Sequence, residues 1–148
     1  MQAFKGKQFF ALCAACLVGL IAALSVRLGC VCRLREIDGR RTFYVYAPSS
    51  KACVRTSLSI NEIFFVTGEC VEKECSSVAV AKEYAKDIVN KYRAVVLFEE
   101  EVDGIKSLYA YAEGLGNGVT VYGKRVNLHI AVKNNRCAVG TPMIFGGY

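Results

Sequence analysis

The sequence contains no tryptophan, only two prolines and a single histidine among its 148 residues. So little proline excludes the collagen-like and proline-rich recognition classes. The one histidine, His129, excludes a metal site built from several imidazoles. Catalytic motifs are missing too: there is no Gly-x-Ser-x-Gly elbow, no His-Glu-x-x-His and no phosphate-binding loop. We therefore expect no enzyme activity and no cofactor.

Acidic residues are also missing from residues 1–30, which carry Lys5, Lys7 and Arg27. Within them, residues 9–26 (FFALCAACLVGLIAALSV) form an uncharged run of 18 residues. At about 1.5 Å per residue the run reaches roughly 27 Å, near the thickness of a bilayer's hydrocarbon core. We expect residues 1–30 to be an uncleaved membrane anchor. The alternative is a cleaved signal peptide, because Ala-Leu-Ser at 23–25 suits a signal peptidase.

Small residues recur at every fourth position of this run. Such a stripe allows two membrane helices to approach closely. It suggests a homodimer through Ala11, Ala15, Gly19 and Ala23.

The net charge of +6 is concentrated near the amino end of the chain. Residues 1–30 contribute +3, whereas residues 42–148 are nearly neutral, with 12 basic against 11 acidic side chains. This near-neutral remainder argues against a nucleic-acid partner. A basic cluster just beyond a membrane span predicts contact with anionic lipid headgroups. The cluster consists of Arg33, Arg35, Arg40 and Arg41.

Charge and cysteine content leave two orientations open. Lys5 and Lys7 favour a cytoplasmic amino terminus, whereas the arginines after the span favour a cytoplasmic domain. Six cysteines lie beyond the span, an even number that permits disulfides and equally suits reduced thiols. If the domain is exported, we expect a local disulfide between Cys70 and Cys75. Their spacing is not that of a usual zinc knuckle, so we expect no metal.

The rest of the sequence alternates short strands with one clear helix. The helix is predicted from Ser76 or Ser77 to about Tyr92, with apolar residues at helical spacing on one side. Around it we expect a helical turn over 60–64 and strands over 42–47, 65–72, 94–98, 107–112, 118–121, 126–132 and 138–145. This order predicts an α+β domain over 31–148, an antiparallel sheet covered by one main helix.

Two stretches of this domain are alike. Residues 36–47 (EIDGRRTFYVYA) and 101–112 (EVDGIKSLYAYA) are identical at six of 12 positions. Duplication would give repeat halves over 36–72 and 76–148. The alternative is convergence of two similar turn-and-strand segments.

Strand alternation would place four tyrosines on matching sheet faces, with Phe43, Val45, Leu108 and Ala110 toward the core. Because aromatic surfaces suit sugar rings and peptide chains, these tyrosines are the candidate ligand-binding residues. Packing under a helix or against the other half is the alternative. The four are Tyr44, Tyr46, Tyr109 and Tyr111.

The carboxyl end adds a family resemblance. Residues 124–132 (KRVNLHIAV) and 139–148 (VGTPMIFGGY) contain an Asn-Leu-x-x-Ala strand and a Gly-Thr-Pro segment that runs to a final tyrosine. Over residues 76–148 the chain resembles the YwmB family, exported proteins of Firmicutes with a TATA-box-binding-protein-like fold. The resemblance implies extracytoplasmic placement and carries no catalytic motif.

Together these observations predict a membrane-anchored, extracytoplasmic and non-enzymatic module that binds or assembles with a cell-envelope protein or glycan. One alternative is a cytoplasmic saddle domain that binds nucleic acid or protein. A third reading is a small enzyme that depends on the thiol of Cys70 or Cys75.

Overall fold

A computed structural model describes the backbone of residues 2–146 and the side chains of residues 8–146. The chain forms two compact units, Met1–Cys30 and Val31–Tyr148. Tyr148, the final residue of the YwmB resemblance, lies outside the described residues.

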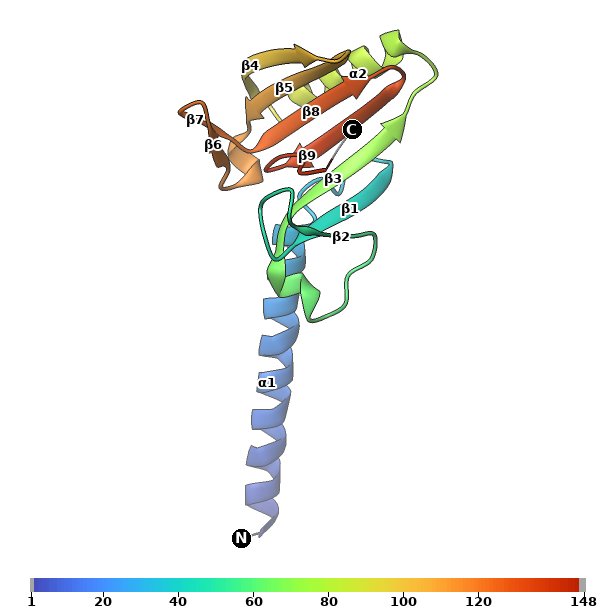
Figure 1. Cartoon of the computed structure of the whole chain (residues 1–148). Coiled ribbons are helices and arrows are strands. Elements are labelled where there is room, and N and C mark those ends of the chain that lie inside the picture. Colours follow the sequence, from blue (N-terminus) through green and yellow to red (C-terminus); the bar gives the residue numbers. More distant parts are fainter. Residues whose placement is uncertain (1, 147–148) are drawn as a thin grey trace. The chain divides into compact units, whose positions relative to one another are not determined.

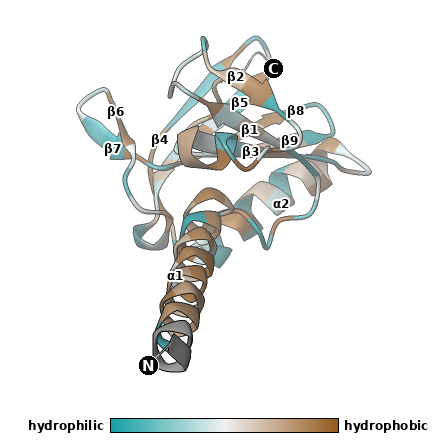
Figure 2. Ribbon diagram, turned by 90° about the horizontal axis from the view of Figure 1, so that it is seen from below, coloured by the Kyte–Doolittle hydropathy of each residue, from teal (hydrophilic) through white to brown (hydrophobic). Residues whose placement is uncertain are grey.

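Helix α1 (Gln2–Val31) contains the predicted membrane segment. Its part Gln8–Val31, 24 residues with a mean hydropathy of 2.6, is long and apolar enough to cross a membrane. Figure 2 shows α1 coloured as hydrophobic along most of its length. The same length and composition also suit a signal sequence. The stripe of small residues lies exposed on this helix, at Ala11, Ala15, Gly19 and Ala23.

The larger unit is built on one antiparallel sheet of seven strands in the order β2-β1-β3-β9-β8-β5-β4 (Figure 1). From edge to edge these strands are β2 (Cys53–Arg55), β1 (Arg40–Val45), β3 (Val66–Glu74), β9 (Arg136–Thr141), β8 (Leu128–Lys133), β5 (Ile105–Tyr111) and β4 (Val95–Val102). A separate hairpin pairs β6 (Val119–Val121) with β7 (Lys124–Val126). Two short 3-10 helices are η1 (Glu62–Phe65) and η2 (Glu113–Leu115).

Helix α2 (Val78–Lys91) covers one face of this sheet. Of the two serines predicted at its start, Ser77 caps the helix: its side chain accepts a hydrogen bond from the backbone N–H of Val80. Burial of apolar side chains between helix and sheet is the main force that holds the two layers together. The shared core includes Ala81, Ala85 and Ile88 of α2 and Val71, Leu108, Ile130 and Val139 of the sheet. The predicted α+β domain, an antiparallel sheet with one covering helix, is therefore confirmed.

Residues 142–146, which we call the C-terminal strap, cover part of the opposite face. The strap begins at the cis peptide bond between Thr141 and Pro142 and turns back over β9. A Cβ atom added at Gly140 would lie 2.7 Å from Cγ1 of Ile144, so the strap sits against bare backbone. Phe145 packs edge-on against Tyr44, with ring centroids 5.3 Å apart. The strap thus closes the face over β1, β3 and β9.

Several strand boundaries differ from those predicted, each for a local reason. The strand predicted over 94–98 continues to Val102, because the glutamates that follow keep pairing with β5. The strand predicted over 126–132 is interrupted at Asn127, whose buried side chain bonds instead to the backbone of Ala112 and Gly116. The strand predicted over 138–145 ends at Thr141, because Pro142 has no N–H to continue the ladder.

Candidate functional site

Three rings are stacked across neighbouring strands on the sheet face opposite α2, and we call them the aromatic ladder. Phe98 of β4 lies 4.5 Å from Tyr109 of β5 between ring centroids, with 16° between the ring planes. Tyr109 in turn lies 4.4 Å from His129 of β8, with 12° between the planes. Side chains alternate along a strand, and the neighbours Leu108 and Ile130 point into the core under α2. The three rings therefore share the other face.

The hairpin of β6 and β7 borders the ladder at Phe98. Tyr122, in its turn, is 79% exposed and meets the Phe98 ring edge-on at 5.6 Å. The Lys124 ammonium lies 5.8 Å from the Phe98 centroid and donates a hydrogen bond to the carbonyl of Leu97 at 2.9 Å. The stacked rings contact one another through their faces, and of the three only Phe98 and Tyr109 are partly exposed. Tyr122 adds an exposed ring beside them.

Strand β4 forms an edge of the sheet, and no strand among the described residues pairs with its outer side. The two-residue turn at 103–104 joins it to β5 and places Val102 opposite Ile105. Residues that flank such a turn form a hydrogen-bonded pair, and pairs of this kind alternate along the hairpin. Glu99 and Glu101 therefore direct their backbone N–H and C=O groups outward, where a further strand would pair.

The same edge is acidic. Residues 99–101 are three consecutive glutamates, and only Glu99 has an ion-pair partner on the neighbouring strand, Lys106 at 2.8 Å. Like charges on two copies of β4 would repel, which disfavours pairing of the chain with itself along this edge. The remaining negative charge favours a basic strand instead.

His129 connects the ladder to the C-terminal strap. Its Nδ1 accepts a hydrogen bond from the backbone N–H of Ile144 at 3.3 Å, and its ring is 7% exposed. Burial lowers the pKa of His129 from 6.5 to about 4, so the imidazole is neutral at pH 7. It lies on the predicted strand face, opposite Leu128 and Ile130. In this geometry the imidazole joins Tyr109 of the sheet to the backbone of the strap.

The four candidate tyrosines do not form one surface. Tyr44 is buried beneath the strap. Tyr46 leaves the strand with a φ of 73°, and its ring packs against Phe65 at 5.1 Å. Tyr109 belongs to the ladder, and Tyr111 is half-buried two residues farther along β5. The residues predicted to face the core are all buried: Phe43, Val45, Leu108 and Ala110.

Two ring residues beside Tyr109 were not predicted. The position of Phe98 could have been predicted from the two-residue turn at 103–104. This turn sets the register of the hairpin, and the register places residue 98 opposite residue 109. Tyr122 precedes Gly123, which marks a turn, but no local pattern tells which surface that hairpin borders.

The expected disulfide between Cys70 and Cys75 is wrong. Cys70 lies beneath the strap, whereas Cys75 follows β3 and belongs to the core under α2. Five residues of extended chain span about 16 Å, far more than the Cα separation of a disulfide, about 4.4 to 6.8 Å. Burial also raises the pKa of the Cys70 thiol to about 12. A thiol that stays protonated at neutral pH is a poor nucleophile, which argues against Cys70 as a catalytic thiol.

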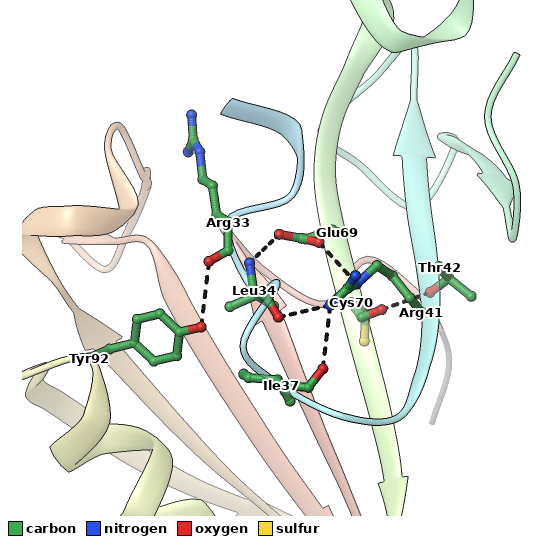
Figure 3. Close-up of polar contacts among 8 residues, drawn as sticks. All are labelled: Arg33, Leu34, Ile37, Arg41, Thr42, Glu69, Cys70 and Tyr92. Carbon is green, nitrogen blue, oxygen red and sulfur yellow. Dashed lines mark hydrogen bonds and ion pairs between the residues drawn. The ribbon is translucent and has the colours of Figure 1, made fainter. Parts of the chain in front are cut away.

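A buried carboxylate attaches the segment after the span to the sheet (Figure 3). Glu69 of β3 has no exposed surface; its Oε1 accepts the backbone N–H of Leu34 at 2.5 Å, and its Oε2 lies 3.5 Å from Arg41 Nε. Arg41 also donates to the Leu34 carbonyl at 2.9 Å. Burial raises the pKa of Glu69, against the lowering effect of Leu34 and Arg41. No sequence pattern distinguishes this glutamate from the exposed acids of the same strand.

Three of the four arginines beyond the span bond within the domain. Arg33 donates a hydrogen bond to the backbone carbonyl of Leu115 at 2.6 Å. Arg40 forms an ion pair with Glu72 of β3, and Arg41 forms one with Glu69. Arg35 is exposed and takes part in none of these bonds. Most of the predicted headgroup cluster is therefore part of the domain's own structure.

An open groove of about 990 Å³ lies where β1 and β9 begin and β3 ends. It is lined by charges of both signs, among them Asp38, Arg40, Glu72, Lys73 and Arg136. Arg40 and Glu72 are ion-paired with each other. The groove therefore does not present a surface of one charge.

In the described part of the chain, no group of three or more histidine, cysteine or acidic side chains is placed to hold a metal ion. Comparison with protein-family models, with curated proteins and with solved structures gave no match. The resemblance to the YwmB family, the saddle-like fold and the duplication of two halves thus stay predictions.

Proposed function

We propose that this chain is a membrane-anchored, extracytoplasmic and non-enzymatic module that binds an extended segment of an envelope protein along β4. The observation that carries the proposal is the position of the ladder beside an unpaired strand edge. A strand added to β4 would gain backbone hydrogen bonds, and its side chains would contact Phe98 and Tyr122. Extracytoplasmic placement is supported by the family resemblance alone.

The chemistry of the edge favours a basic peptide chain over a glycan. Two of the three glutamates at 99–101 lack an ion-pair partner among the described residues. Lysine or arginine side chains on an added strand would neutralise them. A sugar would need free aromatic faces, whereas the ring faces of Tyr109 are already stacked on both sides.

Binding of short fluorescent peptides to the full chain in lipid nanodiscs tests this proposal. The probes are Lys-Val-Lys-Val-Lys-Val-Lys, the same peptide with alternate amides N-methylated, and its glutamate counterpart. We expect a rise in fluorescence anisotropy with the unmodified basic peptide only, because N-methylation removes the strand hydrogen bonds and glutamate reverses the charge. Equal binding of the methylated peptide would overturn the edge-pairing mode.

A matched pair of variants locates the binding surface. Tyr122→Ala should weaken peptide binding by about tenfold, or about 1.4 kcal/mol, as expected for an exposed aromatic residue that becomes buried at an interface. Tyr46→Ala removes another exposed tyrosine, remote from β4 in the sheet order, and should leave the affinity unchanged. Equal effects of the two variants would contradict a site at β4.

Labelling of intact cells tests the side of the membrane. Cys53 is exposed and Cys70 is buried in the same domain. A membrane-impermeant maleimide, followed by mass spectrometry of the peptides, should modify Cys53 before lysis and leave Cys70 unmodified until unfolding. Modification of Cys53 only after lysis would place the domain in the cytoplasm and refute the extracytoplasmic part of the proposal.

A further inference from the structure

A second exposed apolar surface lies away from β4, around η1. Its members are 52% to 68% exposed although all are large and apolar or aromatic. The Tyr46 N–H donates to the carbonyl of Phe65 at 2.9 Å, which joins the end of β1 to η1. We call this surface the η1 patch, and it consists of Tyr46, Ile60, Phe64 and Phe65.

One residue links the η1 patch to the membrane segment. Val31 is the last residue of the stretch that is apolar enough to cross a membrane. It is also a core residue of the larger unit, where its buried side chain packs with Phe43 and Ile63. Ile63 belongs to η1 and directly precedes Phe64 and Phe65 in the sequence.

The length of the span fixes the level at which Val31 leaves the bilayer. The 24 residues of Gln8–Val31 extend about 36 Å as a helix. The hydrocarbon core of a bilayer is about 30 Å thick, so the end of such a span lies in the headgroup region. A cluster that contains Val31 and Ile63 therefore lies at the membrane surface when the span is inserted.

We propose that the η1 patch is a membrane-docking surface that inserts into the interfacial layer of the bilayer crossed by α1. Aromatic side chains are enriched at this level, because their rings tolerate both headgroups and acyl chains. The charge within η1 suits such a contact, because Glu62 is neutralised by an ion pair with Arg55 at 2.8 Å. Apolar side chains that cost free energy when exposed to water would thus be covered by lipid. The domain would then be attached to the membrane at two points, the span and the patch.

The absence of tryptophan permits a test with a single fluorophore. Phe64→Trp places the probe in the patch, and Ile60→Trp provides a second probe if the first variant does not fold. Tyr122→Trp is the matched control, because it replaces an aromatic residue that is even more exposed. Each full-length chain is reconstituted in phosphatidylcholine–phosphatidylglycerol vesicles with and without lipids brominated near the headgroup.

We expect a blue-shifted emission and strong quenching by brominated lipid for the patch probes, and solvent-like emission without quenching for Tyr122→Trp. Solvent-like emission from both patch probes in folded chains would overturn the proposal, as would equal quenching of the control. The result does not depend on peptide binding at β4, so failure of one proposal leaves the other intact.

Discussion

Tyr44 of β1 and Tyr109 of β5 occupy the same position in the two similar stretches, residues 36–47 and 101–112. Tyr44 is 3% exposed and packs against Phe145 of the strap, whereas Tyr109 is partly exposed. Both tyrosines lie on the sheet face opposite α2, and each precedes a fully buried residue, Val45 or Ala110. The difference comes from the strap, which is remote from both strands in sequence and covers only one of them. The strap thereby covers the half of the face that contains Tyr44, whereas the half that contains Tyr109 is not covered by it.

Replacing each tyrosine by alanine should give the largest difference between the two halves of the face, measured as the loss of unfolding free energy. Tyr44→Ala should lower the free energy of unfolding by about 3 to 5 kcal/mol, because it leaves a cavity beneath the strap. Tyr109→Ala should cost only about 1 to 2 kcal/mol, mainly the loss of two ring contacts. Denaturant unfolding of the full chain in detergent micelles, followed by circular dichroism, gives both values. Equal losses would mean that both halves are packed alike.

Acidification should next weaken the connection between the halves, because His129 contacts both of them. Its pKa falls from 6.5 in the unfolded chain to about 4 in the folded one, so the unfolded state binds more protons between these values. The stability present above pH 6.5 should therefore be lost as the pH falls to 4, by about 3 kcal/mol for this group.

The matched chain for this experiment is His129→Phe, which keeps a ring against Tyr109 and removes the titrating group. The raised pKa of Glu69 acts in the opposite direction over part of this range, but it is common to both chains. The difference between their unfolding free energies from pH 4 to 7 therefore isolates His129. Parallel curves would show that the imidazole is not buried between ladder and strap.

Local patterns in the sequence predict the buried core of the domain better than they predict the sheet face opposite α2. Helical spacing predicts α2, and strand alternation predicts that Phe43, Leu108 and Ala110 are buried. Each of these patterns is a property of a single helix or strand. The site depends on contacts between distant segments. No local pattern places the strap over Tyr44, and none brings the β6–β7 hairpin to Phe98.

The same limit explains the errors at Cys70 and Cys75. Closeness in sequence suggests a disulfide, but an extended strand carries the two thiols apart and into different clusters. The prediction for Arg41 has the same weakness. Its position after the span suggests a lipid contact, whereas its partner in the structure is the buried carboxylate of Glu69. Charge and spacing along the chain identify these residues as candidates but do not identify their partners.

Opening the strap without changing either tyrosine is the mildest test of the comparison. A Cβ at Gly140 would lie 2.8 Å from the backbone nitrogen of Ile144 and 2.9 Å from the Met143 carbonyl carbon, so Gly140→Ala forces the strap to shift. We expect a loss of about 1 to 3 kcal/mol. Gly114→Ala has no atom within 4 Å of its new Cβ and should be neutral or stabilising by up to about 1 kcal/mol.

Thiol reactivity distinguishes a displaced strap from a general loss of stability. Cys70 is buried with Tyr44 in the cluster beneath the strap, so Gly140→Ala should make Cys70 react with maleimide faster, at denaturant concentrations where the domain is still folded. Cys137 lies in the core under α2 and should stay protected in the same sample. If both thiols become reactive together, the strap is part of the cooperative core. If Cys70 alone becomes reactive, the strap is a separable cover, and the two halves of the face differ only by its presence.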